Sequence, residues 1–388
     1  MTIEKFEILK EKTAHTNQLD PKMASTKIWA STNWEQLKKS ETEEILFPFL
    51  NFQFERAKKT MPAVYKPYSE RKIKLTEFND LEKIPALVKD TTNNLLGLRE
   101  KIERNPYIMQ PADISTGLTI YKSGGTRGVA TPTFITEWDE KVEAQGLKKC
   151  FEYMGISQKD TVLNMYNPTH KGGQCIRNAM LMIGLRIIPR RTTDTAKEIV
   201  DTIDDYGITV LASVQGPLNE GDKTKKGGGV DFLSLIEVGQ DILEDKLQTL
   251  FITGYTLIPE LVSWAETHEK KLATVLGSTE AIPQSTSTIP GGICKYNNQH
   301  LINGTHYVEI LKQESKQLVP VKRGEIGILA YTTIAREGTI YIRYAPGDSA
   351  KLVANGGECD CGIKTPIISD IRRIDIPEDT IAAGCCIG

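Results

Sequence analysis

The chain has 388 residues, of which 39% are hydrophobic and 25% charged, so it can bury a large core in one large or two medium domains. Lysine and arginine (48) nearly balance aspartate and glutamate (50), which argues against a nucleic-acid-binding or membrane-surface protein. Because the sequence has no apolar run of about 18 residues, no apolar leader and only seven cysteines, we expect a cytoplasmic protein without membrane partners or a disulfide framework.

The N-terminal residues 1–80 are expected to form a charged helical segment, to which we assign no chemistry. A short β-favouring run then precedes the glycine-rich stretch 121–132, YKSGGTRGVATP. Its glycines allow positive φ angles and let several N–H groups converge on one anion, while Ser123, Thr126 and Arg127 add hydroxyl groups and positive charge. The spacing matches neither the Walker pattern nor the dinucleotide-binding G-x-G-x-x-G. The stretch is therefore either a polyphosphate-binding loop or an ordinary hairpin turn.

Strands and helices alternate through residues 81–288. Apolar residues at helical spacing alternate with short β-favouring runs at 161–165, 186–189, 208–212, 247–253 and 272–276. This alternation predicts an α/β layered domain with a largely parallel sheet. Residues 289–376 are rich in β-favouring runs, including 338–344, and predict a smaller β-rich subdomain, followed by a tail at 377–388.

Two further stretches place polar groups at predicted strand ends. Gly277, Ser278, Thr279 and Glu280 follow a predicted buried strand, at the edge where open α/β sheets bind ligands. A hydroxyl and a carboxylate there suit Mg²⁺ and phosphate oxygens, although a helix N-cap with a first-turn Glu has the same pattern. Asp348 ends the run YAPGD, where its carboxylate is either an acceptor for ribose hydroxyls or an ordinary turn residue.

Together, a Ser/Gly/Thr loop near residue 125, a Gly-x-Thr-Glu near 280 and a Gly-Asp near 348 resemble the signatures of the adenylate-forming superfamily. This superfamily includes acyl- and aryl-CoA ligases, luciferase and peptide-synthetase adenylation domains, and the chain most resembles its phenylacetate–CoA ligase-like subgroup. Supporting runs lie at 171–189, 250–254, 342–348 and 359–362. The resemblance extends over residues 80–376 and implies the layered large domain of these enzymes, with ATP and Mg²⁺ as cofactors.

The resemblance implies a role for each matching position. Thr279 and Glu280 would contact the α-phosphate and Mg²⁺, and Asp348 would hold the ribose. Arg373, at the arginine-aspartate hinge where the family's large domain ends, would also bind ATP. The residues implied to wrap the β- and γ-phosphates are Ser123, Gly124, Gly125, Thr126 and Gly128, and the catalytic set is Thr126, Arg127 and Glu280. The residues implied to bind the carboxylic acid are His170, Gly173, Gly254, Gly277 and Ser278.

The implied reaction is attack of a carboxylate oxygen on the α-phosphorus of ATP, with release of pyrophosphate. A carboxylate is already ionised at about pH 7, so no general base is needed, and catalysis consists of positioning and charge neutralisation. The expected substrate is an aromatic or heteroaromatic acid, and the expected acyl acceptor is CoA, a carrier protein or a reductase.

The sequence also departs from the family pattern. Arg127 replaces a threonine, and His170 replaces an aromatic residue, which indicates either a more polar substrate or an ordinary pocket-wall histidine. The family continues beyond the hinge with a small mobile domain carrying a catalytic lysine, whereas this sequence ends about a dozen residues after Asp375. The short form resembles stand-alone adenylating proteins of antibiotic biosynthesis, including phenazine pathways, and more distantly the acyl-protein synthetases of bacterial luminescence. Two alternatives stay open: an acyl- or aryl-CoA ligase that completes the thioester, and a non-catalytic binding protein.

The cysteines fall into three groups. Cys150 and Cys175 lie in helical patterns and are expected in the core, whereas Cys385 and Cys386 are either an acyl acceptor or part of a terminal tail. The third group consists of Cys294, His300, Cys359 and Cys361. Three thiols and one imidazole are a normal structural zinc set, and the alternative is that these are free core side chains.

Overall fold

In a computed structural model, the chain forms two compact units, each assembled from separate segments. Unit 1 comprises Met1–Val142, Thr279–Gln284 and His300–Gly388, and unit 2 comprises Glu143–Ser278 and Ser285–Gln299. The structure describes residues 39–84, 87–88, 98–114, 117–123, 130–191, 194–214, 231–253, 257–289, 292–294, 299–314, 317–334 and 336–373. The boundaries expected near residues 80, 288 and 376 remain predictions.

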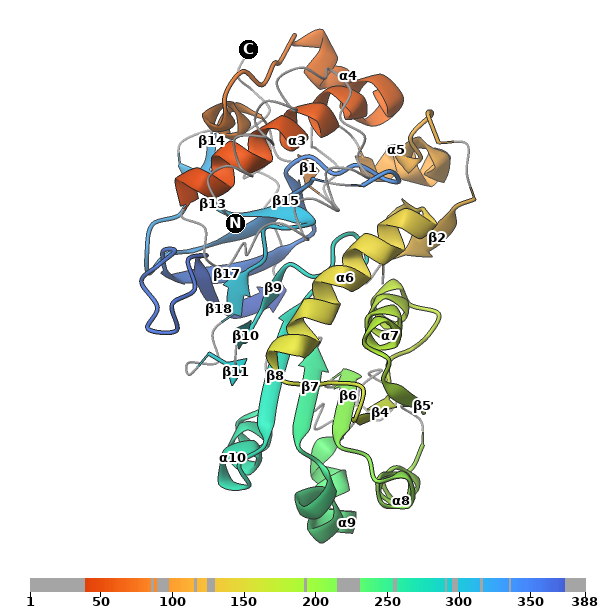
Figure 1. Cartoon of the computed structure of the whole chain (residues 1–388). Helices are drawn as coiled ribbons and strands as arrows, with labels where there is room; N and C mark the ends of the chain where they lie inside the picture. Colours follow the sequence, from red (N-terminus) through yellow and green to blue (C-terminus); the bar gives the residue numbers. More distant parts are fainter. Residues whose placement is uncertain are drawn as a thin grey trace, which may run out of the picture. The chain divides into compact units, whose positions relative to one another are not determined.

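Unit 2 contains a parallel sheet with helices in its connections (Figure 1). Its strands run in the order β5-β4-β6-β7-β8, all parallel, and β9 then pairs antiparallel with β8. The strands are β4 (Thr161–Asn164), β5 (Arg186–Pro189), β6 (Val210–Val214), β7 (Thr249–Thr253), β8 (Lys271–Leu276) and β9 (Ser285–Thr286). The helices are α7 (Lys171–Ile183), α8 (Ala196–Tyr206), α9 (Phe232–Lys246) and α10 (Pro259–Thr267). A small antiparallel pair, β10 (Thr288–Ile289) and β11 (Gly292–Ile293), also belongs to this unit.

Local sequence signals explain where these helices begin and end. α8 starts with a capping box, in which Thr195 and Glu198 satisfy each other's backbone N–H groups. α7 ends at Gly184, whose φ of 84° lies in the left-handed region that favours glycine. Helices α8, α9 and α10 share one buried cluster with the strands, so a continuous apolar core holds the sheet and these helices together.

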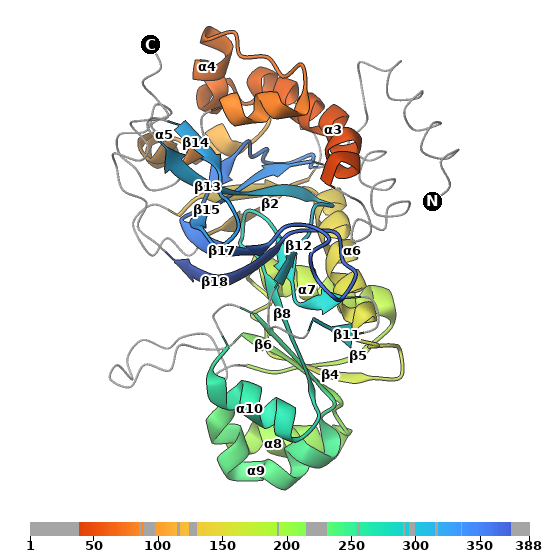
Figure 2. The ribbon, with the colours of Figure 1, turned by 90° about the vertical axis from the view of Figure 1, so that its left-hand side faces the viewer.

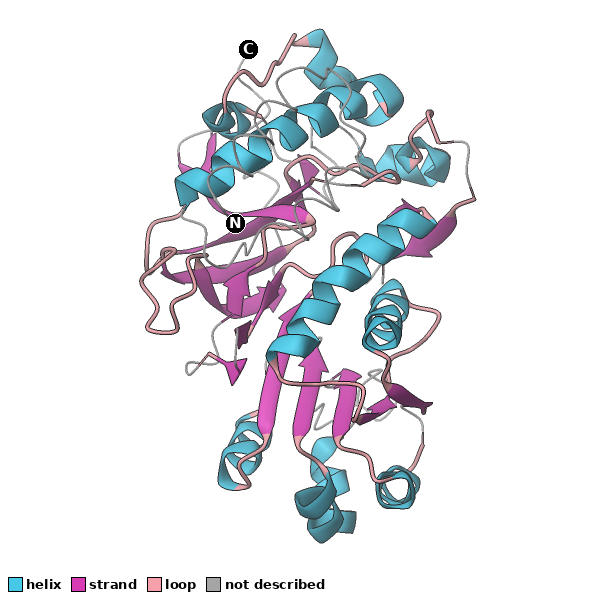
Figure 3. Ribbon diagram, in the orientation of Figure 1, coloured by secondary structure: helices cyan, strands magenta, loops and turns pink. Residues whose placement is uncertain are grey.

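Unit 1 combines helices with an antiparallel sheet (Figures 2 and 3). The sheet contains the ladder β16-β15-β17-β18, with β1 parallel to β16, and β13 pairs with both β14 and β15. Its strands are β1 (Leu87–Val88), β13 (His306–Glu314), β14 (Gln317–Pro320), β15 (Ile326–Thr333), β16 (Tyr344–Ala345), β17 (Asp348–Ala354) and β18 (Ile367–Arg373); β12 (Gln299–Leu301) lies where the chain returns to this unit. The helical elements are α3 (Lys39–Thr60), α4 (Pro62–Glu70), η2 (Phe78–Lys83), α5 (Leu98–Arg104) and η3 (Pro106–Met109).

A separate hairpin in unit 1 flanks the glycine-rich stretch. β2 (Thr119–Lys122) pairs antiparallel with β3 (Pro132–Ile135), and the chain then enters α6 (Glu137–Tyr153), which continues into unit 2. The parallel α/β layer and the β-rich part confirm the fold class predicted from the sequence. The continuous β run expected at 338–344 is wrong, because residues 336–343 are irregular and Arg343 has a φ of 45°, outside the extended region. Among the described helices, none is long and apolar enough to cross a membrane.

Candidate nucleotide-binding site

The ends of the glycine-rich loop are joined by hydrogen bonds. The Ser123 N–H donates to the Thr131 carbonyl at 3.1 Å, and the Thr131 N–H donates to the Ser123 Oγ at 2.9 Å. Both side chains are buried. These two bonds close the loop at its base, and the role of Ser123 toward a phosphate remains a prediction. The other predicted loop residues, Gly124, Gly125, Thr126, Arg127 and Gly128, lie outside the described residues.

Thr279 and Glu280 lie in unit 1, and both are buried, with 4% and 2% of their surfaces exposed. The Glu280 carbonyl accepts a 2.6 Å hydrogen bond from Arg336, and the Glu280 carboxylate lies 3.4 Å from the Tyr344 hydroxyl. The same hydroxyl lies 3.4 Å from the Thr131 Oγ1. The tyrosine hydroxyl therefore lies between the predicted magnesium-binding carboxylate and the end of the glycine-rich loop.

The backbone around Asp348 has a special conformation. Gly347 precedes it with a φ of 101°, a conformation that side chains disfavour, so the glycine allows the turn that places Asp348 at the start of β17. Asp348 is half-buried, and its backbone pairs in register with Arg373 on β18. Two residues that the sequence assigned to ATP binding are thus brought together in one ladder, although the Arg373 side chain is not described.

Buried side chains hold Tyr344 in place. The Arg343 guanidinium forms 3.1 Å contacts with both carboxylate oxygens of Glu309 and donates to the carbonyl of Ile84 at 2.6 Å. The Tyr344 ring packs against Tyr341 with a centroid distance of 4.6 Å. Aromatic rings in such contact are rigid, which keeps the Tyr344 hydroxyl directed toward Glu280.

The residues expected to bind the carboxylic acid belong to unit 2. His170 is exposed and caps α7, where its Nδ1 accepts from the Gly172 N–H at 3.1 Å. Gly173 is required by space, because a Cβ there would lie 2.0 Å from the Asn167 carbonyl oxygen. After β8, Gly277 is exposed and Ser278 is half-buried. Carboxyl ends of parallel strands share one sheet edge, so the segments after β4 and β8 are suited to a ligand site. Gly254 lies outside the described residues.

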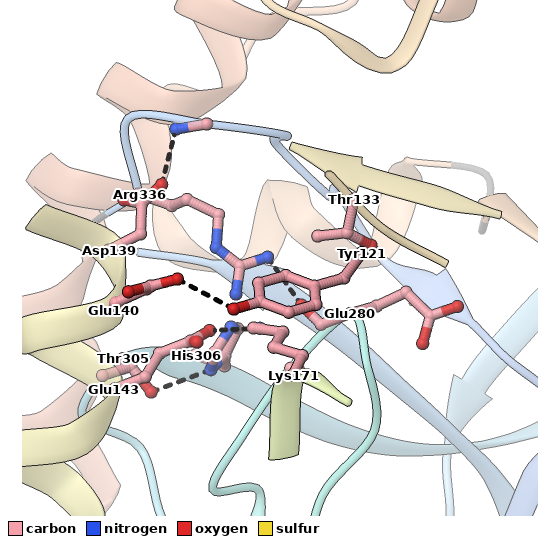
Figure 4. A network of polar contacts seen from close by, with 12 residues as sticks. Tyr121, Thr133, Asp139, Glu140, Glu143, Lys171, Glu280, Thr305, His306 and Arg336 are labelled. Carbon is pink, nitrogen blue, oxygen red and sulfur yellow. Dashed lines mark hydrogen bonds and ion pairs between the residues drawn. The ribbon is translucent and has the colours of Figure 1, made fainter. Parts of the chain in front are cut away.

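A buried ion pair adjoins the His170 cap within unit 2, and the sequence reading missed it. The Lys171 Nζ lies 2.8 Å from the Glu143 carboxylate, and their side chains are only 2% and 3% exposed (Figure 4). A buried charge is costly unless it is paired, so this contact fixes the first turn of α7 against α6. Both residues look like ordinary surface charges in the sequence, which gave no signal for the pair.

The predicted zinc ligands in unit 1 lie close together. The ligand atoms of His300, Cys359 and Cys361 are within 4.8 Å of one another, and the Cys361 Sγ lies 3.3 Å from the His300 Nε2. Burial lowers the pKa of His300, which favours the neutral imidazole that a metal needs. Thiolate and imidazole donors fit zinc. Cys294 belongs to unit 2, and its contribution remains a prediction.

The remaining described cysteines are core residues, as expected. Cys150 and Cys175 are both buried, and burial raises the pKa of the Cys150 thiol to about 11. Such a thiol stays protonated near neutral pH and is a poor nucleophile. Cys385 and Cys386 lie outside the described residues, so their role as an acyl acceptor is untested.

This arrangement of elements is also found in solved structures of an acyl-CoA ligase, which confirms the fold that the resemblance implied. Two solved structures of 2-hydroxyisobutyryl-CoA ligase show the similarity. One, an open conformation with 2-HIB-AMP and CoA, superposes with a TM-score of 0.69 and 16% identity over 86% of this chain and 75% of its own. The other, in the thioesterification state with the same ligands, has a TM-score of 0.70 and 17% sequence identity, and the match covers 88% of this chain and 70% of the ligase chain. No family model matches the sequence, and neither does any curated protein. The phenylacetate–CoA ligase-like subgroup remains a prediction.

Proposed function

We propose that the protein activates a carboxylic acid with ATP, forming an acyl-adenylate and releasing pyrophosphate. The observation that carries this proposal is the contact of Tyr344 with both Glu280 and Thr131, at the end of the glycine-rich loop. A carboxylate and a loop of this type serve the same ligand in an adenylating enzyme, namely the phosphates of ATP with their metal ion. The similar fold of a ligase whose structures contain an acyl-adenylate supports the same reaction.

The chain's own residues account for the chemistry. The acid is ionised at about pH 7 and attacks the α-phosphorus directly, so these residues bind and orient rather than transfer protons. Thr279 and Glu280 would hold Mg²⁺, which supplies positive charge to the phosphate oxygens. The loop N–H groups with Thr126 and Arg127 would hold the outer phosphates, and Asp348 would accept the ribose hydroxyls.

The finer assignment concerns the acid and the acceptor. An aromatic or heteroaromatic acid, bound by the exposed end of α7 and the segment after β8, remains our preferred substrate. His170 is exposed there and offers an imidazole edge, which suits an acid with a polar ring substituent. CoA is the first acceptor to test, because CoA accompanies the adenylate in the similar ligase structures; a carrier protein or a reductase is the alternative.

ATP–pyrophosphate exchange over a panel of aryl, heteroaryl and short aliphatic acids tests the proposal directly. We expect exchange that depends on both acid and Mg²⁺ and falls at least 100-fold in Glu280→Gln and Asp348→Asn, the scale of a lost positioning contact. Glu358→Gln is the matched control, because Glu358 is an exposed acid in the same unit. ATP binding without exchange for any acid would instead support a non-catalytic binding protein, and absence of ATP binding would refute the proposal.

We also propose that zinc is structural, bound by His300, Cys359 and Cys361 with Cys294 as the fourth ligand. Metal analysis of the purified protein should find about one zinc per chain, lost in Cys359→Ser but retained in Cys175→Ser, because Cys175 is buried in α7 outside the cluster. Protein purified without zinc and unable to bind added zinc would remove this proposal.

A further inference from the structure

An irregular segment of unit 1, residues 336–339, touches both parts of the candidate nucleotide site. Arg336 is almost completely buried, with 3% of its surface exposed. Its Nη1 donates a 2.6 Å hydrogen bond to the carbonyl of Glu280, as Figure 4 shows. The residue whose side chain is proposed to hold the metal is thus held at its backbone by a buried arginine.

The same segment is hydrogen-bonded to the β2–β3 hairpin, which flanks the glycine-rich stretch. The Thr339 N–H donates to the Phe134 carbonyl at 2.8 Å, and the Phe134 N–H donates to the Thr339 Oγ1 at 2.8 Å. A Cβ at Gly338 would lie 1.9 Å from the Phe134 carbonyl oxygen, so only glycine permits this approach. Hydrogen bonds on both sides of Phe134 therefore fix β3 to the segment.

The segment is also tied to the first turn of α6 and to α3. The Asp139 carboxylate accepts the N–H groups of Glu337 and Gly338 at 2.8 and 2.9 Å. Gln53 and Arg56, both on α3, each donate to the Arg336 carbonyl at 2.9 Å. Two elements, α3 and α6, thus hold the backbone of the segment. The Arg336 guanidinium therefore reaches Glu280 from a fixed position.

We propose that Arg336 is a positioning residue that holds the Glu280 backbone in register with the β2–β3 hairpin, so that the Glu280 carboxylate keeps the position in which it would bind magnesium. This inference rests on the proposed function. A planar guanidinium can direct an N–H at one carbonyl with little freedom, and a carboxylate displaced by about 1 Å from its productive position can cost about 100-fold in rate. A merely structural arginine would lower stability without changing the metal requirement.

Arg336→Gln and Arg336→Lys test the role, with pyrophosphate exchange measured over a range of Mg²⁺ concentrations at saturating ATP and acid. We expect Arg336→Gln to reduce the maximal rate about 10- to 100-fold and to raise the half-saturating Mg²⁺ concentration. Arg336→Lys should rescue part of the loss, because lysine keeps the positive charge and can still donate an N–H. Arg323→Gln is the control, since Arg323 belongs to the same unit but its side chain is 64% exposed. A rate loss that is equal at every Mg²⁺ concentration would overturn the proposal.

A second readout does not depend on catalysis. Hydrogen exchange of the amides in residues 279–284 should be faster in Arg336→Gln than in the wild type, and unchanged in Arg323→Gln, because only the first variant releases the Glu280 peptide. Unchanged exchange in this segment would overturn the proposal even if activity falls. If the wild type shows no pyrophosphate exchange, the proposed function fails, and the hydrogen-exchange result still decides whether Arg336 holds Glu280 in place.

Discussion

Asp139→Asn provides a demanding test of the packing in unit 1. The Asp139 carboxylate is 1% exposed and accepts three backbone N–H groups, from Thr136 at 3.1 Å, Glu337 at 2.8 Å and Gly338 at 2.9 Å. Asparagine keeps the size but replaces one oxygen with an NH₂ group, so at least one buried N–H loses its acceptor. An unsatisfied buried donor costs about 1–3 kcal/mol. We therefore expect local opening to become roughly 5- to 150-fold more frequent.

Native-state hydrogen exchange of the Glu337 and Gly338 amides measures this opening at the groups concerned. Glu70→Gln is the matched control, because the Glu70 side chain is 61% exposed and pairs with the exposed Lys66 in the same unit. Exposed ion pairs contribute about 0–1 kcal/mol, so exchange should change about 5-fold at most in the control. If both amides exchange in Asp139→Asn at the wild-type rate, the carboxylate does not hold this segment and the reasoning is refuted.

Three further changes have defined outcomes. Gly173→Ala should destabilise the protein by about 1–3 kcal/mol in urea unfolding, because the new Cβ would lie 2.0 Å from the Asn167 carbonyl oxygen; unchanged stability would refute the close approach. Lys171→Met leaves the Glu143 carboxylate buried without its cation and should cost about 3–5 kcal/mol in the same assay, whereas a loss below 1 kcal/mol would contradict the buried pair. Burial raises the pKa of Asp139, so the folded state binds the carboxyl proton more tightly than the unfolded state does. The contribution of Asp139 to stability therefore falls as the pH rises from the usual aspartate pKa through the raised pKa. Unfolding at several pH values should therefore show a larger stability advantage of wild type over Asp139→Asn below this interval than above it.

The sequence predicted the elements that depend on local patterns. The parallel strands of unit 2 were predicted from short β-favouring runs that alternate with helical patterns, because hydrophobic period is read within a few residues. Glu280 and Asp348 were predicted as site residues because each lies in a short motif beside a strand, and their roles stay predictions. The structure places Glu280 next to Tyr344, a residue of the same motif as Asp348 that was given no role.

The contacts that hold the site together were not predicted, for a physical reason. Asp139 and Gly338 are separated by 199 positions in the sequence, and Arg336 and Glu280 are separated by 56 positions. Nothing local marks such pairs, and a charged residue is read as a surface residue because burial of charge is rare. The expected strand at 338–344 failed for a related reason: β-favouring side chains are numerous there, but Arg343 leaves the extended region to reach Glu309.

The two groups of candidate residues differ in burial, and this difference agrees with the roles that we propose for them. In unit 1, Ser123, Thr279 and Glu280 are buried, which suits the proposed binding of phosphates and a metal ion in one fixed geometry. In unit 2, His170 and Gly277 are exposed, and an exposed edge can vary its contacts with the acid without disturbing a core. Under the proposed function, the buried residues would bind ATP and Mg²⁺ in the same way in every reaction, whereas the exposed residues would adapt to the particular acid. Substitutions near Glu280 should thus alter the reaction with every acid alike, whereas those near His170 should alter which acid is accepted.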